Sequence, residues 1–288
     1  MSGDDIWGRL FNFANYGELL ALVQNSIIAA AVLGIVGGLI GVFVMQRDMA
    51  FAVHGISELS FAGAAGALLL GANVVAGSLV GSLIAAAVIG ILGARARDRN
   101  SIIGVLMPFG LGLGILFLAV YPGRSGNKFG LLTGQIISVD VPQLSMLIGI
   151  SIAVLAVLLV VWRPLTFDSL DSEVAAARGV PSRTLSFVFM ILLGLTVAVS
   201  VQIIGALLVL ALLVTPAASA LRVSSSPVLV PVLSMVFGFV SAVGGILLAI
   251  GGSLPISPYI TTISFLIYLV CRIIGAGRSR TAAVGSTA

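Results

Sequence analysis

The sequence predicts an all-α, polytopic helical membrane protein with eight to nine transmembrane helices. Hydrophobic residues make up 59% of the 288 positions and charged residues only 8%, whereas an ordinary soluble domain carries roughly 25% charged residues. Apolar runs of about 18 or more residues, long enough to cross a bilayer as helices, recur along the whole chain. We therefore expect a single transmembrane domain over residues 1–288.

The apolar runs place the predicted helices in order along the chain. They lie near residues 18–45, 50–71, 74–93, 102–121, 143–162, 185–201, 204–221, 228–250 and 256–275. The stretch LSFVFMILLGLTVAVSVQIIGALLVLALLV is longer than one helix needs to cross about 30 Å of hydrocarbon. Ser200, Gln202 and Gly205 mark a possible turn within it. We expect nine spans, and eight spans with a broken helix is the alternative.

The basic residues predict the orientation, because cytoplasmic loops carry an excess of Lys and Arg. With the N-terminus outside and nine spans, 11 of the 14 Lys and Arg residues face the cytoplasm. Only Arg9, Arg124 and Lys128 fall outside. We therefore expect an outer N-terminal segment over residues 1–17 and a cytoplasmic C-terminal tail over residues 276–288.

Several classes of function lack the residues they need. The basic residues are scattered among short turns and form no patch for nucleic acid. Lys128 has no P-loop around it, and one histidine supports neither a Ser-His-Asp triad nor an H-E-x-x-H zinc site. We expect no enzyme, no permanently bound cofactor and no internal disulfide for the single cysteine, Cys271. Because Asp4 and Asp5 stand where a signal peptide is basic, we also expect no cleaved leader.

The longest predicted cytoplasmic connection, WRPLTFDSLDSEVAAARGVPSR, contains the signals of a short helix. We expect Pro164 to stop the preceding helix, and Asp168 or Ser169 to cap a new one. Acidic residues follow in the first turn, where the helix dipole favours anions. Arg178 falls in the last turn of this helix, and Gly179 is placed to end it. The segment over residues 164–183 is either a capped linker or a docking helix for a soluble partner.

A histidine and a carboxylate lie four residues apart inside the second apolar segment, in FAVHGISELSFAG. Residues at i and i+4 share a helix face, so His54 and Glu58 can reach one ligand or each other. Glu58 would lie roughly 12 Å into the membrane, where a charge is costly unless it is paired or faces a wet cavity.

Two interpretations of this pair remain open. In the structural one, neutral Glu58 bonds His54 or nearby backbone and locks two helices together. In the functional one, both residues face a polar route and handle a divalent cation, which suits Zn²⁺ best and is acceptable for Mn²⁺ or Fe²⁺. Ser57 and Ser60, or a second copy of the chain, could then complete the ligand set.

From about residue 18 to 275 the sequence resembles the permease subunits of bacterial zinc/manganese ABC importers. The resemblance begins in GGLIGVFVMQRDM and continues in the second span, where the family typically reads Gly-Asp-Ala-Leu-Ser-His-Ala. Here the stretch is VHGISEL, so Ser57 matches while His54 stands at the family's aspartate and Glu58 at its histidine. The segments DSEVAAARGVP and GALLVLALLVTPAASALR resemble the family's coupling region and following span.

The resemblance implies an importer of divalent metal in a prokaryotic plasma membrane, zinc being the expected cargo and manganese or iron alternatives. It implies metal-handling roles for His54, Glu58 and Ser57. Its implied partners are a second permease copy, a cytosolic ATP-binding subunit and an extracellular metal-binding lipoprotein. The helix over residues 168–179 would dock on the ATPase, with the residues Asp168, Asp171, Glu173, Ala176, Arg178 and Gly179. The competing hypotheses are a proton-coupled secondary transporter that uses Glu58, and a membrane scaffold without transport.

Overall fold

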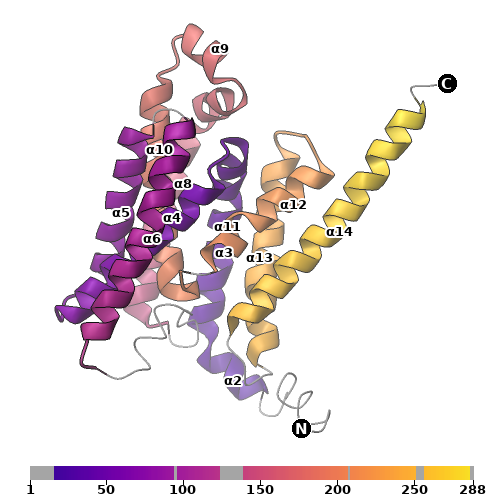
Figure 1. Cartoon of the computed structure of the whole chain (residues 1–288). Helices are drawn as coiled ribbons and strands as arrows, with labels where there is room; N and C mark the ends of the chain where they lie inside the picture. The colour runs from indigo at the N-terminus through magenta and orange to yellow at the C-terminus, as the bar shows by residue number, and fades with distance from the viewer. Residues whose placement is uncertain (1–15, 94–95, 124–138, 207, 251–255, 286–288) are drawn as a thin grey trace. The chain divides into compact units, whose positions relative to one another are not determined.

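The computed structural model describes residues 16–93, 96–123, 139–206, 208–250 and 256–285, and within these ranges the regular structure is entirely helical (Figure 1). Eight of the described helices are long and apolar enough to cross a membrane. They are α3 (Gln24–Gln46), α4 (Ala50–Leu69), α5 (Val74–Leu92), α6 (Ala96–Val120), α8 (Val141–Leu170), α10 (Ser182–Ile204), α13 (Leu229–Ile250) and α14 (Ile256–Gly285). The all-α membrane class is confirmed.

Four shorter helices complete the described chain. They are α2 (Tyr16–Leu22), α9 (Ser172–Ala177), α11 (Val209–Leu213) and α12 (Thr215–Val223). The expected seventh span over residues 204–221 is wrong as a continuous helix. The chain leaves α10 at Gly205, whose φ of 88° is open to glycine and strained for other residues. The turn expected at Gly205 is thus confirmed, and a broken pair of short helices follows it.

The chain forms two compact units, of which the larger contains residues 46–210. Helix α4 is the centre of this unit and is buried over most of its length. Gly63 on α4 faces Gly77 and Gly81 on α5 so closely that a Cβ at any of the three would strike the backbone of the facing helix. Small residues of this kind let membrane helices approach at backbone distance. The glycines of α4 and α5 therefore let these two helices pack at backbone distance.

The second unit contains residues 1–45 and 211–288. Gly34 on α3 faces Gly238 on α13, and the Ser234 hydroxyl donates a hydrogen bond of 2.6 Å to the Gly38 carbonyl. The residue numbers on α13 fall as those on α3 rise, so the two helices are antiparallel. At the other end, the Tyr16 hydroxyl donates to the Leu247 carbonyl at 3.1 Å.

The broken segment of α11 and α12 lies between two long helices in the order of the chain. Helix α13 runs opposite to α3 within its unit (Figure 1). After α3, the five long helices α4, α5, α6, α8 and α10 follow in sequence. The broken α11–α12 segment follows α10 and precedes α13 in the sequence, at the place where the seventh span was expected.

Candidate functional site

His54 and Glu58 lie on one face of α4, as their spacing predicts. The distance from His54 Nε2 to Glu58 Oε1 is 3.7 Å, which is too long for a hydrogen bond. The Glu58 side chain is 2% exposed and the His54 side chain 24% exposed. Within the described part of the chain, His54 Nδ1 and Glu58 Oε2 are buried without a hydrogen-bond partner. Each residue therefore keeps a potential ligand atom that the protein does not use.

Helix α6 packs against the backbone of α4 beside this pair. Gly110 of α6 lies against the backbone of α4, and a Cβ there would be 3.0 Å from the carbonyl carbon of Glu58. The Glu58 side chain itself is 2% exposed. A carboxyl group buried in this way is unfavourable when ionised unless a cation or hydrogen-bond donors compensate it.

The two serines considered as further ligands lie in different surroundings. The Ser57 hydroxyl donates to the His54 carbonyl at 2.8 Å, so it stays beside the pair, and its oxygen lone pairs remain able to accept. Ser60 instead bonds Ser78 of α5, with 2.7 Å between the hydroxyl oxygens, and Ser78 donates to the Ala198 carbonyl of α10. The structure therefore brings Ser57 close to the pair and uses Ser60 to join α4 to α5.

No group of three or more His, Cys, Asp or Glu side chains that could hold a metal ion occurs among the described residues. The pair on α4 provides one imidazole and one carboxylate. Such a set is too small for the closed four-ligand site of a structural zinc. The assignment of His54, Glu58 and Ser57 as metal-handling residues stays a prediction.

The segment that precedes the short helix differs from the expectation. Helix α8 continues through Pro164 to Leu170, and Pro164 does not stop it. Two side-chain hydroxyls bond backbone carbonyls on either side of the proline, Thr166 to Trp162 at 2.8 Å and Ser169 to Leu165 at 2.6 Å. The burial of Leu165 and Asp168 then holds this last turn against its neighbours, so tertiary packing overrides the local preference.

Helix α9 is shorter than the predicted helix over residues 168–179, because Asp171 and not Asp168 or Ser169 caps it. Asp171 Oδ1 accepts from the backbone N–H groups of Glu173 and Val174, at 3.1 and 3.0 Å. Glu173 lies in the first turn, as expected. The helix ends before Gly179, whose φ is 82°, so the predicted glycine stop is confirmed. Arg178 is the C-cap residue rather than part of the last turn.

Most residues of α9 are exposed. Among the predicted coupling residues, Asp171, Glu173, Ala176, Arg178 and Gly179 are exposed. Figure 1 shows α9 at one end of its unit, between the end of α8 and the start of α10. The geometry thus presents a short capped helix to a partner, and its role in coupling stays a prediction.

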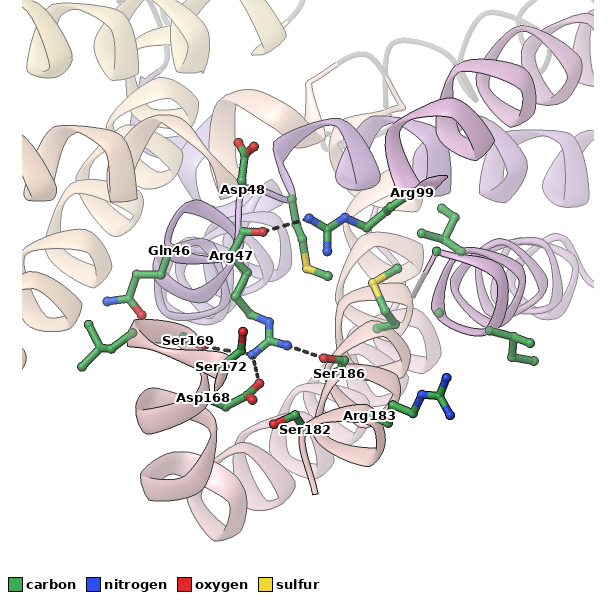
Figure 2. A pocket seen from close by; sticks show the side chains of 17 residues that line it. Gln46, Arg47, Asp48, Arg99, Asp168, Ser169, Ser172, Ser182, Arg183 and Ser186 are labelled. Carbon is green, nitrogen blue, oxygen red and sulfur yellow. Dashed lines mark hydrogen bonds and ion pairs between the residues drawn. The ribbon is translucent and has the colours of Figure 1, made fainter. Parts of the chain in front are cut away.

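Asp168 belongs to a buried charge cluster that sequence reasoning missed. Its Oδ2 lies 2.7 Å from Nη1 of Arg47, and their side chains are 1% and 10% exposed. Arg47 also donates to the Ser169 and Ser186 hydroxyls, and its guanidinium lies 5.8 Å from the centre of the Phe189 ring (Figure 2). The prediction that Asp168 lies on an exposed coupling helix is therefore wrong. The two charges are 121 positions apart in the sequence, and no local pattern pairs them.

Long apolar helices, a lone acid–imidazole pair inside one of them and an exposed capped helix between two others define a polytopic transport protein. The chain belongs to the ABC 3 transport family, whose model matches residues 20–275. It is a multi-pass membrane permease and not an enzyme, which confirms the family resemblance drawn from the sequence.

Two relatives and one solved structure illustrate the similarity. The chain is 31% identical to the manganese transport system membrane protein MntC of Halalkalibacterium halodurans, over 78% of this chain and 77% of that protein. It is 31% identical to the manganese import system permease protein ScaB of Streptococcus gordonii, over 86% of this chain and 89% of that protein. The structure of PsaBC from Streptococcus pneumoniae in complex with Fab matches with a TM-score of 0.80 at 28% identity, over 90% of this chain and 95% of that one.

Proposed function

We propose that this chain is the permease subunit of an ATP-driven importer of a divalent transition metal, with manganese as the principal cargo. The observation that carries the proposal is the His54–Glu58 pair, which leaves one imidazole nitrogen and one carboxylate oxygen without protein partners. The names of two relatives, MntC and ScaB, specify manganese transport. Membership in an ABC transport family favours ATP over a proton gradient as the energy source.

The ligand chemistry fits a cargo in transit. A divalent cation compensates the buried carboxylate of Glu58, and the neutral imidazole of His54 adds a nitrogen donor. Two protein ligands hold a cation weakly, which allows release to the next position along a pathway. The zinc preference expected from the sequence finds no support in these relatives, while carboxylate oxygen is a ligand that manganese favours.

The assembly we propose contains a second copy of this chain, a cytosolic ATP-binding subunit and an extracellular metal-binding lipoprotein. Helix α9 is the segment proposed to contact the ATP-binding subunit, because it is short, capped by Asp171 and exposed. It then faces the cytoplasm, as the distribution of basic residues predicts. The PsaBC structural match supports an assembly of the ABC type.

The test is uptake of radioactive manganese and zinc by the complete complex in liposomes. We expect ATP-dependent uptake of manganese by the wild type. His54→Ala should lower the uptake of both metals, and that of zinc more strongly, because zinc depends more on the nitrogen ligand. Ser60→Ala is the matched control on the same helix and should retain uptake, since Ser60 bonds α5. Uptake driven by a proton gradient without ATP would instead favour the secondary transporter.

A further inference from the structure

We propose that Arg47 is the positioning residue that couples the movement of α9 to helix α4, which carries His54 and Glu58. The inference rests on the proposed function, because it concerns how a docking helix drives a metal pathway. Arg47 lies in the turn between α3 and α4, outside both the predicted metal site and the predicted docking helix.

The turn that contains Arg47 is short and tightly defined. Only Arg47, Asp48 and Met49 separate α3 from α4. Asp48 has a φ of 52°, in the left-handed region that few residues other than glycine adopt, and Met49 is 2% exposed. A turn of three residues with a buried end has few alternative conformations. A displacement of Arg47 is therefore transmitted to the first turn of α4.

The guanidinium of Arg47 bonds residues on both sides of α9. Nη1 donates to Asp168 Oδ2 at 2.7 Å and to the Ser169 hydroxyl at 3.2 Å, both in the last turn of α8. Nη2 donates to the Ser186 hydroxyl in the first turns of α10. Figure 2 shows these contacts converging on one side chain. The fork of an arginine can make several such bonds at once, whereas a lysine is a single point charge.

A second arginine ties the same turn to α6. Arg99 Nη2 donates to the backbone carbonyl of Arg47 at 3.2 Å. Further along, α6 lies against α4 at Gly110, beside Glu58. The turn is therefore held by side chains from α6, α8 and α10, and two of these three helices flank α9.

The cluster is not packed as a purely structural one would be. It borders a cavity of about 870 Å³, and within the described chain Arg47 Nε and Asp168 Oδ1 have no hydrogen-bond partner. Space and unused polar atoms permit a second arrangement of the cluster. Buried ion pairs contribute little net stability, and their best attested use is to specify a register or a switch. We infer that movement of α9 shifts the ends of α8 and α10, and that Arg47 carries this shift to α4.

The first test separates coupling from stability in the complete complex reconstituted in liposomes. Arg47→Gln should reduce the metal transported per ATP hydrolysed at least fivefold, while ATP hydrolysis stays within twofold of the wild type. Arg47→Lys should give an intermediate ratio, because it keeps the charge but loses the fork. Arg163→Gln is the control, since Arg163 is an exposed arginine on α8 that lies outside both the cluster and the docking segment. An unchanged ratio in Arg47→Gln would overturn the proposal.

The second test needs neither metal nor transport, so it stands even if the proposed cargo is wrong. Phe51 in the first turn of α4 is 68% exposed, and Phe51→Cys in a Cys271→Ser background offers one thiol at this place. We expect a non-hydrolysable ATP analogue to change the labelling rate of this thiol in the complex at least threefold. Ser186→Ala, which removes one contact and keeps the ion pair, should halve that change, and Arg47→Gln should abolish it. An identical change in all variants, or no change in the parent, would show that α4 does not follow α9 through Arg47.

Discussion

The unit over residues 46–210 contains two pairs of an acidic and a basic residue, and the two pairs differ in distance and bonding. Arg47 and Asp168 are 2.7 Å apart and come from segments 121 positions apart in the sequence. His54 and Glu58 are 3.7 Å apart on one helix face. The first pair makes a direct charge-assisted hydrogen bond, and serine hydroxyls support the arginine. The second pair is adjacent but not bonded.

The difference separates a pair that joins segments from a pair that offers ligand atoms. A contact that fixes the fold gains from short hydrogen bonds, because a buried polar atom without a partner is costly. A site that handles a passing cation needs atoms that are not committed to protein partners. Both pairs leave polar atoms without partners, but only Arg47 and Asp168 share a short direct bond, so that pair connects helices and the unbonded His54–Glu58 pair is the candidate site.

The largest expected effect comes from removing the charge of Glu58. Glu58→Gln keeps the shape and removes the anionic ligand, so metal uptake by the complex should fall by roughly 100-fold, since even the outer partners of metal ligands are worth about 10- to 100-fold. The melting temperature of the purified protein should stay the same or rise, because a buried carboxyl becomes a neutral amide.

Asp168→Asn tests the other pair, because it removes the negative charge that Arg47 contacts. It leaves the nearly buried guanidinium of Arg47 without its anionic partner, which costs about 3–5 kcal/mol in comparable buried pairs. The melting temperature should therefore fall clearly in this variant. If Glu58→Gln lowered the melting temperature as much as Asp168→Asn and left uptake intact, the His54–Glu58 pair would be structural.

The parts of the fold that the sequence predicts are those fixed by local composition. Apolar length predicts the eight long helices, and i, i+4 spacing predicts the shared face of His54 and Glu58. The break after Gly205 could be located but not interpreted, because a run of apolar residues does not distinguish one long helix from two short ones. That choice depends on which neighbours pack against the run.

The parts that could not be predicted depend on contacts between distant segments. Pro164 is a strong local stop signal, yet α8 continues because Leu165 and Asp168 are buried beyond it. Arg47 contributes to the basic asymmetry that predicts orientation, but its contact with Asp168 appears only when the ends of α8 and α10 are placed beside the turn. Several residues of opposite charge lie near the ends of the helices, and the sequence alone does not tell which of them pair.

A medium effect is expected in α9, where proline can be placed at two positions with opposite consequences. Ala176→Pro removes a helical N–H and should unfold the short helix, lowering metal uptake per ATP by about tenfold, because a mid-helix proline costs about 3 kcal/mol or more. Ser172→Pro is the matched control, since proline is favoured at the first helical position and Asp171 already has an extended backbone.

The readout for both proline variants is ATP hydrolysis and metal uptake by the same complex in liposomes. Ser172→Pro should retain coupling, while Ala176→Pro should remain inserted in the membrane but fail to couple. Equal and normal coupling in the two variants would make α9 a linker without a docking role.

The smallest effect concerns the packing of α6 against α4 beside Glu58, and α6 contains both the variant and its control. A Cβ at Gly110 would lie 2.6 Å from Leu59 Cδ1 and 3.0 Å from the Leu59 nitrogen, so Gly110→Ala forces α6 away from α4. Overpacking of this kind costs about 1–3 kcal/mol. Gly104 on the same helix has nothing within 4 Å of the added atom, and Gly104→Ala should gain about 0.5–1 kcal/mol from the better helix former. Thermal unfolding in detergent measures both variants, and we expect the melting temperature to fall for Gly110→Ala and to rise slightly for Gly104→Ala. Equal shifts would mean that α6 does not pack against the backbone of α4 as closely as the contact at Gly110 requires.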